Sequence, residues 1–444
     1  MNITRITREF NGFMWIYRPS SSRMTSTHSA AASIHRFFRC EVLRKARLGK
    51  RLAMFAALPF TPFVIAALAT VFTSINGRAI KKLTGKRIVR QFCEQIGIAA
   101  RFAILPPWYY IFGLHDNTKR QQAGEYLNRF EMKGGSGLYH YLRDYNGGLS
   151  LPAERSTSSI RNKCSFMARC HACGVAAAPV FVIVSKGRIT PIEWRETGLP
   201  ETSLFVKPIK GQGGKHTMCW EYLGAGQFRG NAGKIVSGSQ LLDLLRQVSQ
   251  CRDYLVQPRL INHHDIDDLA NGTLSTVRVM SCRNEQDTFE VTDAVFRMTR
   301  KSGVIVDNFH AGGIAANVDI QTGELGRAGD GAWGMVRGGW YERHPETNAP
   351  ILHRKLPCWP ELINFVQNAH TCLFSDQVVI GWDVAILENG PCMIEANKAP
   401  DLDIIQRIKG RPLGNERLGM LLAFNLKRTV ERKYASYAQA SGHS

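Results

Sequence analysis

The chain has 444 residues, 44% hydrophobic content and a formal net charge of +21. A chain of this length can bury a large core, and we expect more than one domain. Residues 1–90 contain 17 Lys and Arg but only Glu9 and Glu41 as acids, so this region carries +15 of the net charge. The remaining residues carry only +6, which argues against a diffuse nucleic-acid surface on the main body of the protein. We therefore expect no specific nucleic-acid partner.

The first 50 residues are predicted to form a basic, disordered tail. Serine-rich stretches at 20–22 and 29–33 occur in it, and no helical or strand period is sustained. Met24 and Met54 are both candidate start positions.

Residues 51–84 form a hydrophobic segment with basic flanks. The 21 residues 52–72 carry no charge, and this is about the length that crosses a bilayer core. Pro59 and Pro62 would break the first half of such a span, and basic residues on both sides indicate no orientation. We favour a buried or membrane-surface helical hairpin over a true span, and both over a cleavable signal. The basic flanks would draw a cytoplasmic protein to the anionic inner face of a membrane, either peripherally or as an anchor.

Residues 85–150 are predicted to be a helical N-terminal region, because Ile88, Phe92 and Ile96 recur at helix spacing. The aromatic run at 106–112 within it is interpreted as a packing anchor rather than a ligand site.

Eleven cysteines, an odd number scattered along the chain, favour a reducing compartment over a disulfide framework. Cys170-His171-Ala172-Cys173 allows a zinc interpretation. No second pair stands at zinc-ribbon spacing, so small buried thiols are favoured.

A predicted strand at 205–208 delivers Lys207 to the glycine-rich stretch 209–215. Glycines let the backbone approach an anion closely, and the flanking lysines add positive charge. The Walker pattern is missing, and a plain surface loop is the alternative.

Residues 254–260 are predicted to be a buried strand that ends at Pro258. The carbonyl of Pro258 can accept a hydrogen bond from an adenine amino group, and the N–H of Leu260 can donate to the ring.

The stretches 381–386 and 393–397 predict two strands joined by a turn at 388–390. In such a hairpin Glu395 and Asn397 point to the same side and can meet Asp383. Two carboxylates and an amide oxygen suit a hard cation, Mg²⁺ or Mn²⁺. The alternative is a hairpin with a solvated polar face.

Taken in this order, these parts resemble the ATP-grasp superfamily over residues 151–408. The narrower resemblance is to the sugar-transfer-associated ATP-grasp family, which is related to α-L-glutamate ligases. It rests on Leu274-Ser275-Thr276-Val277-Arg278-Val279, on Asp307 through Ile314, on His344-Pro345-Glu346-Thr347, and on Gly381-Trp382-Asp383 through Asp403.

The resemblance implies an α+β fold in which two α/β subdomains clasp ATP, preceded by the helical region. The predicted domains are 1–50, the basic tail; 51–84, the hydrophobic segment; 85–150, the helical region; 151–410, the ATP-grasp domain; and 411–444, a C-terminal helix and tail.

The resemblance also implies a role for each candidate site residue. The ATP-binding roles are phosphate binding for Lys163 and Lys207, a lid for Gly213 and Gly214, an adenine hinge for Gln257, Pro258 and Leu260, and a ribose position at His264. The remaining roles are catalysis for Arg278, Arg297 and His310, and metal binding for Asp383, Glu395 and Asn397.

Two positions depart from the pattern of related ligases. An acidic residue contacts the ribose where this sequence has His264, and an arginine often stands where it has Gly381. Arg278 and Arg297 are then the candidates for stabilising the charge of an acyl phosphate and its oxyanion. The resemblance implies an ATP- and Mg²⁺-dependent ligase that joins a small-molecule carboxylate to an amine or a glycan-linked substrate. The alternative is an ATP-binding scaffold protein of a membrane-linked polysaccharide pathway.

Overall fold

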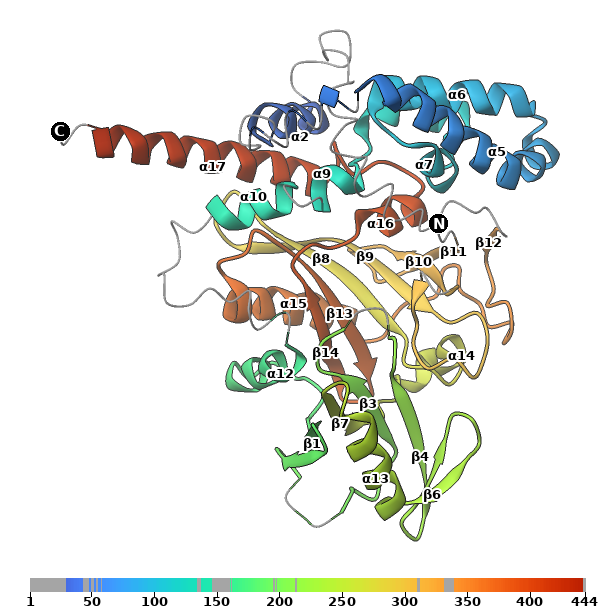
Figure 1. The fold of residues 1–444 in the computed structure, drawn as a ribbon, viewed down its shortest axis with the longest axis vertical. Helices are drawn as coiled ribbons and strands as arrows, with labels where there is room; N and C mark the ends of the chain where they lie inside the picture. Colours follow the sequence, from blue (N-terminus) through green and yellow to red (C-terminus); the bar gives the residue numbers. More distant parts are fainter. Residues whose placement is uncertain are drawn as a thin grey trace.

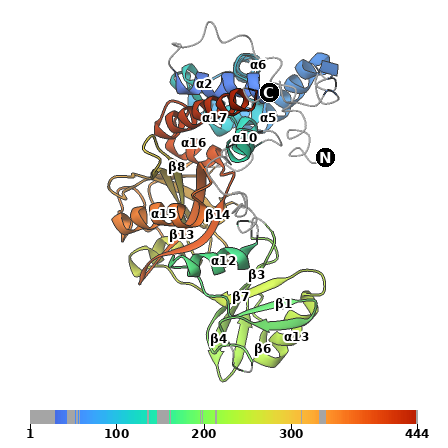
Figure 2. The ribbon, with the colours of Figure 1, turned by 90° about the vertical axis from the view of Figure 1, so that its left-hand side faces the viewer.

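The computed structural model shows an elongated molecule in three layers: helices, a large sheet, and a smaller sheet (Figures 1 and 2). The predicted tail falls outside the described residues over positions 1–28. The structure describes residues 29–42, 48, 52, 55–56, 58–133, 137–145, 160, 162–194, 196, 198–211, 214–309, 312–330 and 339–441.

The larger sheet is antiparallel, with the strand order β12-β11-β10-β9-β8-β13-β14. Its strands are β8 (Thr276–Arg283), β9 (Phe289–Met298), β10 (Ile314–Val318), β11 (Leu325–Gly329), β12 (Trp340–Tyr341), β13 (Val379–Leu387) and β14 (Gly390–Asn397).

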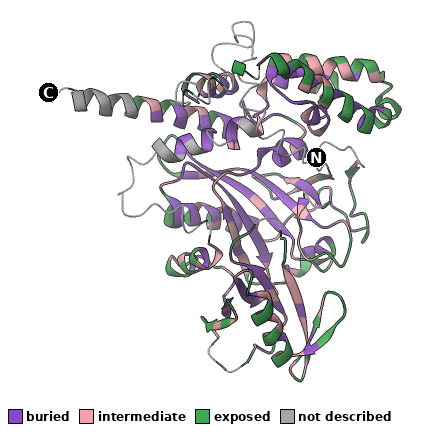
Figure 3. Cartoon of the chain, in the orientation of Figure 1, coloured by how far each residue is buried: buried purple, intermediate pink, exposed green. Residues whose placement is uncertain are grey.

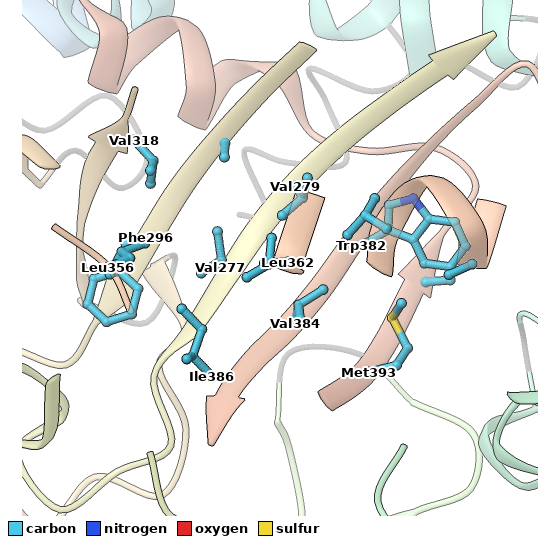
Figure 4. Packing of buried hydrophobic residues seen from close by; sticks show 14 of the residues in the cluster. Val277, Val279, Phe296, Val318, Leu356, Leu362, Trp382, Val384, Ile386 and Met393 are labelled. Carbon is cyan, nitrogen blue, oxygen red and sulfur yellow. The ribbon is translucent and has the colours of Figure 1, made fainter. Parts of the chain in front are cut away.

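Both faces of the larger sheet are covered. Helix α15 (Trp359–Phe374) packs on one face, and α16 (Leu402–Lys409) and α17 (Arg417–Ser441) pack on the other. Strand β13 is buried along nearly its whole length for this reason. Figure 4 shows Trp382 and Val384 of β13 in the core beneath α15, together with Val277 of β8 and Leu362 of α15. Burial on both faces makes β13 a rigid support for the side chains that it carries at the edge hairpin with β14.

The smaller sheet is also antiparallel, with the order β2-β1-β7-β3-β4-β5-β6. Helix α13 (Gly238–Val248) covers it and begins at a capping box in which Ser237 pairs with Gln240. Helix α12 (Lys163–Ala172) begins at an Asn162 cap and packs against α15 and β14. The strands are β1 (Val182–Ser185), β2 (Arg188–Pro191), β3 (Leu204–Pro208), β4 (Met218–Gly224), β5 (Gln227–Gly230), β6 (Ile235–Ser237) and β7 (Tyr254–Pro258).

The predicted helical region consists of short helices around an aromatic core. Tyr109 and Tyr110 of α7 are fully buried there, which confirms that the aromatic run is a packing anchor. Its helices are α6 (Ile88–Phe102), α7 (Pro106–Ile111), α8 (Asn117–Gln121), α9 (Arg129–Lys133) and α10 (Leu138–Tyr145). The longer α5 (Thr61–Thr84) precedes them and packs against α6 and α7.

Residues 29–42 differ from the prediction of a disordered tail. They form helix α2 (Ala30–Phe37) and a short π-helical turn, and Ile34 is fully buried against the C-terminal helix layer. Asn415 accepts hydrogen bonds from Ser29 Oγ at 2.7 Å and from the Ala31 amide at 3.0 Å. These partners lie more than 380 residues away, so the local sequence period gave no sign of the helix.

The hydrophobic segment contains α5, which ends at Gly85 and is followed by α6 packed against it. Residues 58–84 have a mean hydropathy of 1.8 and are long and apolar enough to cross a membrane by length and composition alone. In this structure, however, one side of α5 is buried by other helices.

Candidate active site

A cleft of about 1210 Å³ lies between the two sheets. Nine basic and five acidic side chains are among the described residues that line it, so it favours an anionic ligand. Eleven of the predicted site residues line this cleft together: Lys163, Lys207, Gly214, Gln257, Pro258, Leu260, Arg278, Arg297, Asp383, Glu395 and Asn397.

Lys207 projects from β3 into the cleft and is only 8% exposed. Burial lowers the pKa of Lys207 to about 8, with a further contribution from nearby Lys163, while Glu395 acts in the opposite direction. Among the described residues, no carboxylate or carbonyl accepts a hydrogen bond from its ammonium group. A buried cation without such a partner costs free energy in the empty protein, so the position suits binding of an external anion.

Lys163 stands at the start of α12 and donates from Nζ to the Gly211 carbonyl at 3.1 Å. This contact ties the lysine to the glycine-rich stretch, of which the structure describes 209–211 and 214–215. Gly214 has a φ of +68°, and a Cβ there would lie 2.5 Å from a methyl group of Val306. Only glycine allows this close approach between the loop and the opposite wall of the cleft.

The predicted adenine hinge follows β7 along the cleft. The Gln257 side chain is buried and donates to the carbonyls of Ala178 at 2.9 Å and Pro179 at 3.2 Å, which fixes the strand. Among the described residues, nothing accepts a hydrogen bond from the Leu260 amide. That N–H therefore remains available to a ligand, as the hinge prediction requires.

The hairpin of β13 and β14 has the predicted geometry. Asp383 lies directly opposite Glu395, and a register shift next to this pair leaves Ile394 as an extra residue on β14. Asn397 lies opposite Gly381 on the same hairpin. Burial and the Asp383 carboxylate together raise the pKa of Glu395. Asp383 is buried, Glu395 is half-buried, and the two acids are close enough to repel each other.

Two arginines hold Asp383. Arg278 Nε donates to one carboxylate oxygen and its Nη2 donates to the other at 3.0 Å, while Arg297 Nη2 lies 3.2 Å from Asp383. Burial alone would raise the pKa of Asp383, but these two guanidinium groups outweigh it and hold the pKa below its usual value.

The structure also explains why Gly381 replaces an arginine. A Cβ at Gly381 would lie 2.7 Å from Pro400 Cβ and 3.5 Å from Arg278 Cδ. No longer side chain fits there, and the Arg278 side chain on the neighbouring strand occupies the adjacent space. Positive charge therefore reaches Asp383 from β8 rather than from β13 itself.

The chemistry of the donor set fits a divalent cation. Asp383 and Glu395 supply carboxylate oxygens, and Asn397 supplies an amide oxygen. Asn397 Nδ2 is buried and has no hydrogen-bond partner among the residues that the structure describes. A cation between the acids would relieve the repulsion that raises the pKa of Glu395. In the structure the arginines engage both oxygens of Asp383, so they would share this carboxylate with a metal or turn toward a bound anion.

Among the described residues, His264 is the predicted site residue that does not join this arrangement. His264 lies outside the lining of the cleft, with its Nδ1 2.8 Å from Glu388 on the β13–β14 turn. His310 and Gly213 lie outside the described residues. The roles assigned to these three residues stay predictions.

The cysteines are all free, in agreement with the prediction that they form no disulfide framework. Cys170 is fully buried, and burial raises the pKa of its thiol to about 12. Cys170 is therefore a buried thiol as interpreted, whereas Cys164 and Cys173 are half-buried.

Sequence reasoning assigned no role to Asp307, which is buried beside the arginines. Its Oδ2 accepts from the amide of Thr276 at 2.8 Å and lies 3.4 Å from Arg297 Nε. Burial raises the pKa of Asp307. Asp307 is the first residue of the stretch 307–314, on which the family resemblance partly rests. The sequence therefore indicated that this residue matters, but it did not indicate which residues it contacts.

Two basic side chains for which the sequence predicted no role also line the cleft, and they come from the helical region. Arg129 and Lys133 of α9 line the cleft and both contact Asp401, with Lys133 Nζ at 3.3 Å. The helical region therefore contributes to the wall of the cleft rather than only flanking the ATP-grasp domain.

A family model described as sugar-transfer associated ATP-grasp matches residues 143–418. The chain therefore belongs to the sugar-transfer-associated ATP-grasp family, and its two sheets around the cleft form the ATP-grasp fold. Among curated proteins, none matches this chain.

Several solved structures are similar over 62% of this chain. An L-amino acid ligase from Bacillus licheniformis has 12% identity and a TM-score of 0.35, and the match covers 50% of that ligase, so this chain spans about half its length. A D-alanine–D-alanine ligase from Bacillus anthracis has 12% identity and a TM-score of 0.34 over 71% of its chain. The ATP-grasp ligase PsnB, complexed with a phosphomimetic variant of its minimal precursor, Mg and ADP, has 11% identity and a TM-score of 0.31 over 61% of its chain.

Proposed function

We propose that this protein is an ADP-forming ligase that uses ATP and Mg²⁺ to join a carboxylate to an amine or a similar nucleophile. The observation that carries the proposal is the convergence of Lys207, Asp383 and Glu395 in one electropositive cleft. Family membership supports the use of ATP.

The residues of the cleft suit phosphoryl transfer. Lys163 and Lys207 would neutralise phosphate charge, and Asp383, Glu395 and Asn397 would hold the cation. Mg²⁺, when bound, supplies charge withdrawal from the terminal phosphates. A substrate carboxylate oxygen forms a bond to the γ-phosphorus while the bond to ADP breaks, which gives an acyl phosphate. The nucleophile then bonds to the acyl carbon, phosphate leaves, and the nucleophile releases a proton.

Arg278 and Arg297 are the groups that would stabilise the oxyanion of that second step. Both line the cleft from neighbouring strands and are held beside Asp383. Donors fixed in advance at a buried site stabilise developing charge more strongly than mobile groups do. The position of Arg297 supports an active enzyme over the alternative of an ATP-binding scaffold protein.

We infer that the substrates are a small-molecule acid and an amine or glycan-linked acceptor, in the modification of an envelope glycan or peptide. The description of the family as sugar-transfer associated supports the glycan part. The eleven free cysteines support a cytoplasmic location for the catalytic body.

The test is ADP release from ATP with pooled candidate acids, with hydroxylamine present to trap an acyl phosphate as a hydroxamate. Glu395→Gln should lower ADP release by orders of magnitude and leave the fold intact, because it removes a cation ligand. Glu361→Gln is the matched control, because Glu361 is an exposed acid on α15. Equal turnover in wild type and Glu395→Gln would contradict the metal assignment. ATP binding without hydroxamate from any acid would favour the scaffold.

A further inference from the structure

The side of α5 that faces away from the other helices is apolar. Phe63 is 74% exposed, Val71 43% and Ile75 50%, and they follow one another along this side. No charged residue occurs on α5 before Arg78. Figure 3 shows α5 and α6 exposed along much of their length. Large apolar side chains gathered on one exposed side of a helix, rather than scattered singly, indicate an interaction surface.

The polar groups on this side are already satisfied. Thr70 Oγ1 donates to the Ala66 carbonyl at 2.9 Å, and Ser74 Oγ donates to the Thr70 carbonyl at 2.8 Å. An apolar medium could therefore cover these hydroxyls without leaving an unpaired donor.

Positive charge follows directly after the apolar side. Arg78, Lys81 and Lys82 are all exposed on the last two turns of α5. Glu94 is the only acid between residues 58 and 102, and it pairs with Lys86 at 2.9 Å and Arg120 at 2.9 Å. The exposed side of α5 therefore matches a partner that has an apolar interior and a negatively charged surface layer.

Buried hydrogen bonds connect the opposite side of α5 to α6, and one of these α6 side chains also bonds to α7. Gln95 donates to Thr73 Oγ1 at 2.7 Å and to the Tyr110 hydroxyl at 3.3 Å. Gln91 donates to the Gly77 carbonyl at 3.1 Å. A helix crossing a bilayer alone would break this network and leave these groups unpaired, so α5 should remain on the protein and lie flat.

We propose that the exposed side of α5, from Phe63 to Lys82, docks on the surface of an anionic lipid bilayer with the helix in the plane of the membrane. Phe63, Val71 and Ile75 enter the boundary between headgroups and acyl chains, and Arg78, Lys81 and Lys82 contact acidic headgroups. The helical layer lies at the opposite end of the molecule from β6, so the smaller sheet would point away from the bilayer (Figures 1 and 2).

The experiment is co-sedimentation of the full chain with vesicles of phosphatidylcholine, with or without phosphatidylglycerol, at low and high salt. We expect binding only to the anionic vesicles, weakened by salt. Replacing Arg78, Lys81 and Lys82 by Gln should weaken binding on the order of 100-fold, from about 1 kcal/mol per basic residue. Ile75→Asp should weaken it about 10-fold or more through lost apolar burial.

The matched control is Ile235→Asp on β6, because Ile235 is 52% exposed and Ile75 is 50% exposed. This control should bind like wild type, and circular dichroism should show the same helix content in all variants. Salt-independent binding that survives carbonate extraction would overturn the flat orientation in favour of a span. Absence of vesicle binding, or equal binding by Ile75→Asp, would overturn the proposal. Self-association of the free protein that Ile75→Asp abolishes, without vesicle binding, would assign this side to a second copy instead.

Discussion

Replacing Lys207 by Met should have opposite effects on stability and on ATP binding. Burial lowers the pKa of Lys207 to about 8 from 10.5, so the unfolded chain binds more protons than the folded protein between those pH values. At pH 7 this difference destabilises the empty protein by about 3 kcal/mol, from about 1.4 kcal/mol per pH unit. The destabilisation fades as the pH rises through this window.

The free energy of unfolding, measured with urea in the absence of nucleotide and divalent cations, should therefore show a specific pH dependence. The stability of Lys207→Met relative to wild type should fall by about 2 kcal/mol between about pH 7 and pH 9.5. Titration calorimetry at pH 7 should show ATP binding weakened about 10- to 100-fold, because a charge-assisted hydrogen bond contributes about 1.5–3 kcal/mol.

Lys427→Met is the control, because Lys427 is an exposed lysine on α17 whose side chain lies 3.9 Å from Glu431, one turn further along the helix. It should change neither quantity measurably. A relative stability of Lys207→Met that does not vary with pH would refute the argument that Lys207 is buried while charged. An unchanged ATP affinity would refute its phosphate-binding role.

Two further predictions concern the network behind the hairpin, where Trp382 Nε1 donates to Ser281 Oγ at 2.7 Å and Ser281 contacts His370 Nδ1 at 2.7 Å. Trp382→Phe removes the N–H that donates to Ser281 Oγ and should lower the free energy of unfolding by about 1–3 kcal/mol. Urea unfolding measures this change, and a curve with the same midpoint and slope as that of wild type would contradict it. Burial lowers the pKa of His370 to about 3, below the unfolded value of 6.5, so stability should be lost as the pH falls below 6.5. Between about pH 7 and pH 4.5 the loss from this group should be about 3 kcal/mol, and His370→Gln should reduce it; an equal acid sensitivity in both proteins would show that other groups dominate.

The hairpin and its acids could be predicted from the sequence because strand alternation is a local rule. Once a turn at 388–390 joins two apolar stretches, Asp383 and Glu395 must fall near each other, and the register confirms that they lie directly opposite. The lysine at the end of β3 was predictable for a similar reason, since one charge in an apolar strand requires an explanation.

The arginines on Asp383 could be suspected but not assigned from the sequence. Their contact depends on the order β9-β8-β13, in which Arg278 pairs with Asp383 across one strand boundary and Arg297 reaches it from the next strand. Strand order results from tertiary packing, and no local period encodes it. For the same reason the helix at 30–37 was missed, because it is stabilised by residues from the far end of the chain.

Arg129 and Lys133 of the helical region meet Asp401 of the ATP-grasp domain. Asp401 precedes α16 and also caps it, since it accepts from the Asp403 amide at 3.2 Å. Burial and the neighbouring Asp401 raise the pKa of Asp403 to about 6, so Arg129 and Lys133 face an acidic pair that only partly neutralises them. Because these cations line the cleft, a shift of α9 would change the charge along the cleft wall. Replacements on α9 could therefore change the charge of the cleft while Lys207, Asp383 and Glu395 stay in place.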